Sequence, residues 1–409
     1  MHSHSKHSHS NSPEQRATPQ ARRLLLICTI PLVLATIAGF VLLRPTQVTS
    51  FSKAIELPTS LLDATIVGIA PSICGGLETG DLNCRQARAR LTEGAQKGKT
   101  VSFETGADPV ISRLKVGDKV VLSRIKNGPR EFAYDFADRQ RKTPMVILLL
   151  LFAAVVILLG RWRGFAALVG FGISLIILTG FVLPAILSGR NPLAVAVVGS
   201  AGIMFIALYL AHGINVRTTS AVLGTMASLA ITGLLALLFV NLTHLTGFTS
   251  EEAIFINVAS NKINLQGMLL GGIIIGSLGV LDDVTITQAS AVWELRLANA
   301  ALSRTELYKS ALRIGRDHIA STVNTLVLAY AGASLPLLVL FTIASAKLTD
   351  VLTSEVVAQE IVRTLVGSIG LVASVPITTA LAVLVVGGVH RASSDTQPEE
   401  SHPVPGFWD

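Results

Sequence analysis

The stretch "GMLLGGIIIGSLGVLDDVTITQAS", from Gly267 to Ser290, decides the fold class because it joins a long apolar run to two adjacent acids. Its first 15 residues carry no charge, and the residues after the acids stay mostly apolar until Glu294. A helix needs about 20 predominantly apolar residues to cross a bilayer. The stretch therefore predicts a membrane-spanning helix, with Asp282 and Asp283 either inside the bilayer or hydrated at its cytoplasmic boundary.

The rest of the chain has the same apolar character. Of its 409 residues, 50% are hydrophobic and 14% are charged, whereas a soluble domain carries about 25% charged residues. The fold class predicted is mainly α: a polytopic membrane helix bundle with about eight transmembrane helices and a small extracytoplasmic β domain. The net charge of +7 reflects Lys and Arg in short connections on one side, the positive-inside pattern, and does not predict nucleic-acid binding.

Five segments are expected along the chain. They are a disordered His-rich cytoplasmic tail over 1–21, a transmembrane anchor helix over 22–44, an extracytoplasmic β-rich domain over 45–143, a seven-helix membrane domain over 144–390 and a cytoplasmic tail over 391–409. The spans expected in the membrane domain are 144–160, 164–187, 192–213, 218–241, 267–290, 318–346 and 361–388. The distribution of cations predicts a multi-pass plasma-membrane protein with both termini in the cytoplasm.

Five short runs in the β-rich domain have strand-like composition and are separated by turn residues. These runs are 63–70, 84–91, 99–105, 119–125 and 131–136. They predict a small antiparallel barrel, for which an OB-like barrel is one form. Cys74 and Cys84 lie outside the cytoplasm in this topology, where a disulfide between them would persist; two unpaired thiols are the alternative. No metal or cofactor is expected, since no Cys and His set completes a zinc site.

Helical spacing groups the polar residues of the opening stretch. Gly276, Gly279, Asp283 and Thr287 fall near one stripe, at intervals of three or four residues. Small residues let a neighbouring helix approach closely, so this stripe is expected to face the bundle and not lipid. A charged carboxyl at the bilayer centre costs roughly 2.5–3.5 kcal/mol, which favours a functional reason for its presence.

A related sequence occurs once more in the chain. "GSIGLVASVPITTA" (367–380) matches "GSLGVLDDVTITQA" (276–289) at seven of fourteen positions. Both sequences lie in predicted spans that run from outside to inside. The hairpins 218–290 and 318–388 are therefore interpreted as parallel repeats, with chance similarity of small and apolar residues as the alternative.

Matched, interrupted helices in two halves of a chain point to a transport site. In the second copy, proline replaces threonine, and it is expected to break the helix because it lacks a backbone donor. The candidate transport or ion-binding residues are Asp283, Asp282, Thr287, Asn324 and Ser374. The candidate helix-packing or hinge residues are Gly276, Gly279, Gly367, Gly370 and Pro376.

Three segments carry a family resemblance. They are "GSLGVLDDVTITQASAVWEL" (276–295), "IGRDHIASTVNTLVLAYAGASLPLLVLF" (314–341) and "EIVRTLVGSIGLVASVPITT" (360–379). The chain resembles, over roughly residues 115–390, the YibE/F-like multi-pass membrane proteins of bacteria. The resemblance implies a poorly characterised membrane protein, often assumed to be transport-related, and makes Asp283 the residue that corresponds to the family's acid. Asp282 departs from the family's methionine at that position.

Two functions are compatible with these features. The first is a secondary transporter or permease with an intramembrane acidic site, driven by an ion gradient because the chain lacks a nucleotide-binding motif. The second is a non-transporting accessory or scaffold protein whose β domain binds envelope partners. An enzyme is not expected, since H-E-x-x-H and G-x-S-x-G motifs are missing from the sequence. The expected partners are the lipid bilayer and an unidentified small solute or ion, with a homo-oligomer left open.

Overall fold

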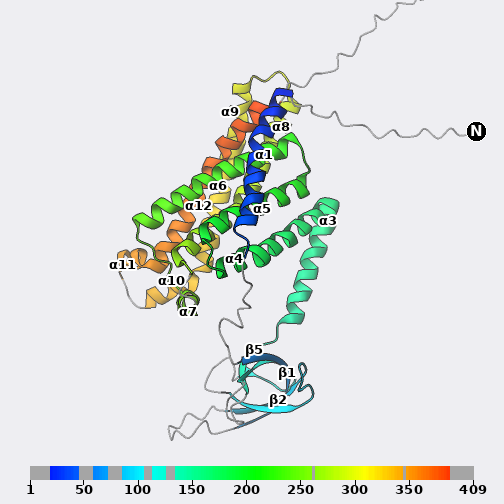
Figure 1. Ribbon diagram of the computed structural model, residues 1–409, viewed down its shortest axis with the longest axis vertical. Helices are drawn as coiled ribbons and strands as arrows, with labels where there is room; N and C mark the ends of the chain where they lie inside the picture. Colours follow the sequence, from blue (N-terminus) through cyan, green and yellow to red (C-terminus); the bar gives the residue numbers. More distant parts are fainter. Residues whose placement is uncertain are drawn as a thin grey trace, which may run out of the picture. The chain divides into compact units, whose positions relative to one another are not determined.

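The computed structural model describes residues 19–45, 59–71, 85–105, 113–125, 134–259, 263–343 and 347–386 (Figure 1). Contacts divide the chain into two compact units, one of them Thr49–Phe165 and the other Met1–Val48 combined with Ala166–Asp409. The first unit holds the described strands, and the second holds most of the helices.

The strands of the first unit are β1 (Thr59–Pro71), β2 (Arg85–Leu91), β3 (Thr100–Thr105), β4 (Lys119–Ile125) and β5 (Tyr134–Arg139). They form one antiparallel sheet in the order β3-β2-β1-β4-β5. β1 pairs with β4 along its first half and with β2 along its second, with a register shift between Ile66 and Gly68. The sheet curls into a half-barrel, which confirms the predicted small antiparallel β domain; in the described residues its edge strands approach each other without pairing.

The core of the half-barrel follows from strand alternation. Ala87, Ala89 and Leu91 of β2 are buried, and the residues between them are exposed, as expected when successive side chains point to opposite faces. Phe103 of β3 and Phe136 of β5 stack with their ring centroids 6.4 Å apart. This aromatic contact joins the two edges of the curled sheet and closes its apolar interior.

α3 (Lys142–Ile177) follows β5 directly and is broken at Arg161, whose backbone φ is 50°. A non-glycine residue rarely adopts this left-handed conformation. The chain turns tightly here. Gly164 lies so close to Val156 that a Cβ on the glycine would collide with the carbonyl oxygen of Val156. The break lies in the short connection that the sequence predicts between two spans.

The helical unit contains the end of α3 and a series of further helices. They are α1 (Pro19–Leu42), η3 (Leu178–Val182), α4 (Leu183–Leu187), α5 (Pro192–His212), α6 (Val216–Leu242), α7 (Glu251–Ala259), α8 (Leu265–Ala298), α9 (Arg304–Ala333), α10 (Leu335–Ile343), α11 (Leu348–Thr353) and α12 (Glu355–Val385).

Six helical stretches among the described residues are long and apolar enough to cross a membrane. The count rises to seven if α9 and α10, bent by 58° relative to each other, form one broken span. One of the six is Lys142–Leu187, whose 46 residues are more than twice the roughly 20 that one span needs. These apolar helices indicate a membrane protein, and the expected eight spans stay a prediction.

The centre of the helical unit is a triplet formed by α6, α8 and α12, which pack extensively on one another. α5 packs on α8, and α9 packs on α12 and α8; α6 and α12 run side by side in Figure 1. Local signals fix where these helices begin. Asn215 and Asn264 accept hydrogen bonds from the backbone N–H groups of Thr218 and Gly267, and Ser303 starts α9 with a capping box.

Candidate functional site

Buried hydroxyl and amide side chains collect where α6, α8 and α12 meet. We name this set the polar seam; its members are Thr225, Ser228 and Thr232 of α6, Ser277, Thr285 and Gln288 of α8, and Ser374, Thr378 and Thr379 of α12. Glycines bring the helices together along it: Gly224 of α6 lies against Thr378, and Gly370 of α12 lies against Thr232. Small residues allow this close approach of helix backbones in membranes.

Two sets of hydrogen bonds join the helices across the seam. The hydroxyls of Thr225 and Thr285 lie 2.6 Å apart. Gln288 Nε2 donates to Thr379 Oγ1 at 2.7 Å and to the backbone carbonyl of Ala311 on α9 at 2.9 Å. Several of the other hydroxyls donate to carbonyls of their own helix. Most polar side chains of the seam therefore have a hydrogen-bond partner, so the few described polar atoms without one are exceptions.

Asp282 of α8 lies beside the seam. Its carboxyl is close to the Thr225 hydroxyl, and its backbone carbonyl accepts a hydrogen bond from Thr285 Oγ1 at 3.2 Å. Within the described part of the chain, its buried Oδ1 has no hydrogen-bond partner, and neither has Thr378 Oγ1. A buried charged oxygen without a partner is costly. A proton or a cation bound at Asp282 would remove this cost.

Asp283 points away from the seam, which reverses the expected orientation of α8. Asp283, Gly276 and Gly279 are exposed, and no described atom lies within 4 Å of a Cβ placed on Gly279. Ile274 and Leu281 are among the α8 residues that are buried instead. Large aliphatic side chains make many more van der Waals contacts than glycine does, so α8 turns its glycine stripe outward.

The other predicted site residues divide between the seam and the surface. Ser374 is fully buried in the seam and donates to the carbonyl of Leu371 at 2.7 Å. Thr287 and Asn324 are exposed. The structure thus brings Asp282 and Ser374 to the seam and leaves the other three predicted residues outside it. A role of any of the five in transport stays a prediction.

The predicted packing and hinge residues also differ among themselves. Gly367 and Gly370 lie in close helix contacts, and a Cβ on Gly367 would be 3.2 Å from Ser277 Oγ. Pro376 lies inside α12, which continues to Val385, so the expected interruption of this helix is not present. Neighbouring helices and local adjustments compensate for the donor that a proline removes from a membrane helix.

The two copies of the repeated sequence lie side by side in α8 and α12. Gln288 and Thr379, which are hydrogen-bonded, occupy equivalent positions of the two copies. Near the other end of the two copies, Ser277 lies against Gly367. Ser277 is the second residue of its copy and Gly367 is the first residue of the other copy. The two helices therefore run in the same direction and in register. Whether the complete hairpins are related as repeats stays a prediction.

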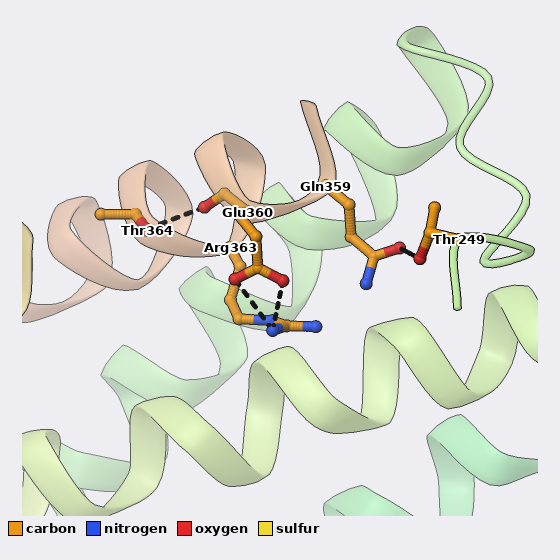
Figure 2. A network of polar contacts seen from close by, with 5 residues as sticks. All are labelled: Thr249, Gln359, Glu360, Arg363 and Thr364. Carbon is orange, nitrogen blue, oxygen red and sulfur yellow. Dashed lines mark hydrogen bonds and ion pairs between the residues drawn. The ribbon is translucent and has the colours of Figure 1, made fainter. Parts of the chain in front are cut away.

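A second polar network, which was not predicted from the sequence, lies at the start of α12. Figure 2 shows Arg363, whose Nη1 donates to both carboxylate oxygens of Glu360 at 2.7 and 3.0 Å. Thr249 donates to Gln359 Oε1 at 2.8 Å and so ties α12 to the connection after α6. Thr364 donates to the backbone carbonyl of Glu360. The spacing of Glu360 and Arg363 by three residues is the signal that could have predicted the ion pair.

A cavity of about 300 Å³ lies among α9, α10, α11 and α12. Its wall is largely apolar, with Tyr330, Glu360 and Thr364 among its polar members. The carboxylate of Glu360 is already paired with Arg363, and Asp282 does not line the cavity. The cavity therefore lies apart from the polar seam.

Metal ligands do not collect in the described part of the chain: no group of three His, Cys, Asp or Glu residues there could hold a metal ion. Cys28 on α1 is exposed and free. The predicted disulfide between Cys74 and Cys84, the tail over 391–409 and most of the His-rich tail lie outside the described residues.

Comparison with known proteins identifies the family of the membrane region. No curated protein and no solved structure matches the chain. The family model for the YibE/F-like protein matches residues 148–388, which include α5, α6, α8, α9 and α12 and thus the whole polar seam. Because the match covers more than half of the sequence, the chain belongs to the YibE/F-like family.

Proposed function

We propose that this protein is a secondary transporter of the plasma membrane, with both termini in the cytoplasm, and that it moves protons by way of Asp282. The observation that carries the proposal is the buried Oδ1 of Asp282, which has no hydrogen-bond partner among the described residues. Ionisable groups inside membrane spans are expensive and usually mark ion pathways or proton relays. Transport without an enzymatic reaction is the activity that such a group supports.

The polar seam supports this proposal because its hydroxyl groups can both donate and accept hydrogen bonds. From Asp282, the neighbouring hydroxyls of Thr225 and Thr285 form the first steps of a path between the helices. The unpartnered Oγ1 of Thr378 offers another polar position. The close contacts of Gly224 and Gly370 with side chains of the neighbouring helix leave little space between the helices of the seam. This favours a proton over a larger cation as the coupling ion.

Proton flux in proteoliposomes tests the proposal. The purified full-length chain would be reconstituted with a pH-sensitive dye inside, and a potassium gradient with valinomycin would impose an inside-negative potential. We expect the lumen to acidify faster than in protein-free vesicles, and we expect Asp282→Asn to reduce the rate to that of protein-free vesicles. Asparagine has nearly the same shape as aspartate, and size-exclusion chromatography would check that the variant is intact. A wild-type rate equal to that of protein-free vesicles would overturn the proposal.

A non-transporting accessory role is the second candidate. The observation that favours it is the compact unit Thr49–Phe165, which has its own core and so provides a separate surface for a partner in the envelope. Under this alternative, wild-type and Asp282→Asn vesicles would both acidify no faster than protein-free vesicles.

A further inference from the structure

Three cations on the outer face of the half-barrel have no acidic partner among the residues that the structure describes. Arg88 and Arg90 of β2 and Lys119 of β4 are exposed. Among the described residues, the side chains of these three form no ion pair with any carboxylate. We name them the basic patch.

Strand pairing brings the basic patch together. Arg90 lies opposite Thr65 of β1, and Thr65 lies opposite Lys119; two strand spacings separate Arg90 and Lys119 by about 10 Å. Arg88 lies about 7 Å from Arg90 along β2, on the same face. Its guanidinium lies over Gly68 of β1, where a Cβ would be 3.5 Å from Arg88 Nη2, an ordinary van der Waals contact. The patch thus presents three positive charges within one small area.

The basic patch lies close to the point where an apolar helix begins. Gln140, just after β5, donates its backbone N–H to the carbonyl of Lys119 at 2.9 Å. Lys142, the first residue of α3, binds Asp63 Oδ2 on β1 at 2.6 Å. Residues 144–160 then contain no charge, and most of their large hydrophobic side chains are exposed. If this helix enters a bilayer, the patch lies at the surface of that bilayer.

The other cations at the start of α3 are already neutralised. Arg139 lies 3.7 Å from the carboxylate of Asp118, and Arg141 lies 2.6 Å from that of Asp138. Lys142 is paired with Asp63. The basic patch differs from these residues because no carboxylate in the described ranges pairs with its charges.

We propose that the basic patch binds the anionic headgroups of lipids at the bilayer surface where α3 enters the membrane. Each cation close to an anionic bilayer strengthens binding by a factor of about five. An arginine guanidinium can also donate two parallel hydrogen bonds to one phosphate group. Thr100 and Ser102 of β3 lie opposite Arg90 and Arg88 and add hydroxyl donors at the border of the patch.

Lysine footprinting of the full-length chain in nanodiscs tests this proposal, with Lys119 as the reporter. A neutral acetylating reagent would label the chain in discs of phosphatidylcholine alone and in discs that also contain phosphatidylglycerol. We expect phosphatidylglycerol to slow the acetylation of Lys119 about five-fold or more at low salt, and high salt to remove the effect. Lys142, which is held by Asp63, is the internal control for the local surface charge and for the fold.

Two double variants that remove the same charge distinguish binding at the basic patch from a general electrostatic attraction of the domain to anionic lipid. Arg88→Gln with Arg90→Gln should abolish most of the slowing at Lys119. Arg85→Gln with Arg124→Gln should leave it unchanged, because these arginines lie five residues away from Arg90 and Lys119 along the same strands.

Three results would overturn the proposal. The first is equal acetylation of Lys119 in both kinds of disc. The second is a slowing in Arg88→Gln with Arg90→Gln that is as large as in the wild type. The third is an equal slowing by inorganic phosphate added to phosphatidylcholine discs, which would assign the patch to a free anion and not to a lipid headgroup.

Discussion

Gly370→Ala places a methyl group where α12 meets α6. The new Cβ would collide with the Thr232 hydroxyl and lie 3.1 Å from Thr232 Cβ. Thr232 cannot rotate away without losing its 2.9 Å hydrogen bond to the carbonyl of Ser228. Overpacking of a tight interior typically costs about 1–3 kcal/mol. We therefore expect the α6–α12 contact to weaken by an amount in this range.

Gly279→Ala is the matched control for this substitution. Gly279 also lies inside a helix, but no described atom would be within 4 Å of its new Cβ. Both substitutions gain the same helix propensity, roughly 0.8–1.0 kcal/mol, so this contribution cancels when the two variants are compared. The difference between their free energies of unfolding should then report the overpacking alone, about 1–3 kcal/mol.

Unfolding of the purified full-length variants in mixed micelles, by titration with sodium dodecyl sulfate and followed by far-ultraviolet circular dichroism, would measure this difference. We expect Gly279→Ala to be as stable as the wild type or more stable, and Gly370→Ala to unfold at lower detergent fraction than Gly279→Ala. Equal midpoints for the two variants would refute the close packing of α6 and α12 at the seam.

Three further predictions concern other contacts. Gln288→Ala should lower the free energy of unfolding by about 2–3 kcal/mol, because it leaves a cavity and removes the bonds to α9 and α12; Gln288→Leu should cost less in the same titration, and a reversed order would contradict the bridging role. Glu360→Gln should lower the free energy of unfolding by about 1–3 kcal/mol, because it leaves the half-buried Arg363 without its partner. Adding Arg363→Gln should restore the stability. A double variant no more stable than the single one would argue against the pair. The hydrogen bond from Lys142 holds the pKa of the Asp63 carboxyl below its usual value, against the effect of burial. The stability from this pair is present above the usual carboxyl pKa and is lost as the pH falls through the lowered one. The protection of β1 amides from hydrogen exchange, relative to the intrinsic exchange rate at each pH, should therefore fall on acidification in the wild type and change less in Asp63→Asn.

Much of the fold follows from local sequence signals. The apolar stretches predict the long helices, and the break between two of them falls at Arg161. Turn residues and short strand-like runs predict the five strands, because one side of this sheet packs on a core and the other does not. β2 illustrates this, since its buried alanines alternate with exposed polar residues.

The orientation of α8 could not be predicted by the same reasoning. In water, an amphipathic pattern identifies the buried face of a helix, but lipid is as apolar as the interior of a membrane protein. α8 carries large aliphatic residues on several sides, so its sequence did not distinguish a glycine face that packs from one that is exposed. The partial burial of Asp282, with its Oδ1 buried, and the exposure of Asp283 therefore depend on how α6, α12 and α5 surround the helix.

Long-range contacts account for the rest of what was missed. The contact of Thr249 with Gln359 joins residues 110 positions apart, and a single sequence gives no indication of such pairing. Pro376 was expected to break its helix on local grounds, yet α12 continues through it. Tertiary packing outweighs a local preference in this case.

The two adjacent acids of α8 provide the most direct test of the proposed function. Asp282→Asn and Asp283→Asn remove the same charge from neighbouring positions, one beside the polar seam and the other on the exposed face. Initial rates of proton entry would be measured for both variants in the same proteoliposomes, at equal protein content. We predict that Asp283→Asn retains most of the wild-type rate and that Asp282→Asn falls to the rate of protein-free vesicles. Loss of flux in Asp283→Asn, with flux retained in Asp282→Asn, would contradict the assignment of the path to the seam.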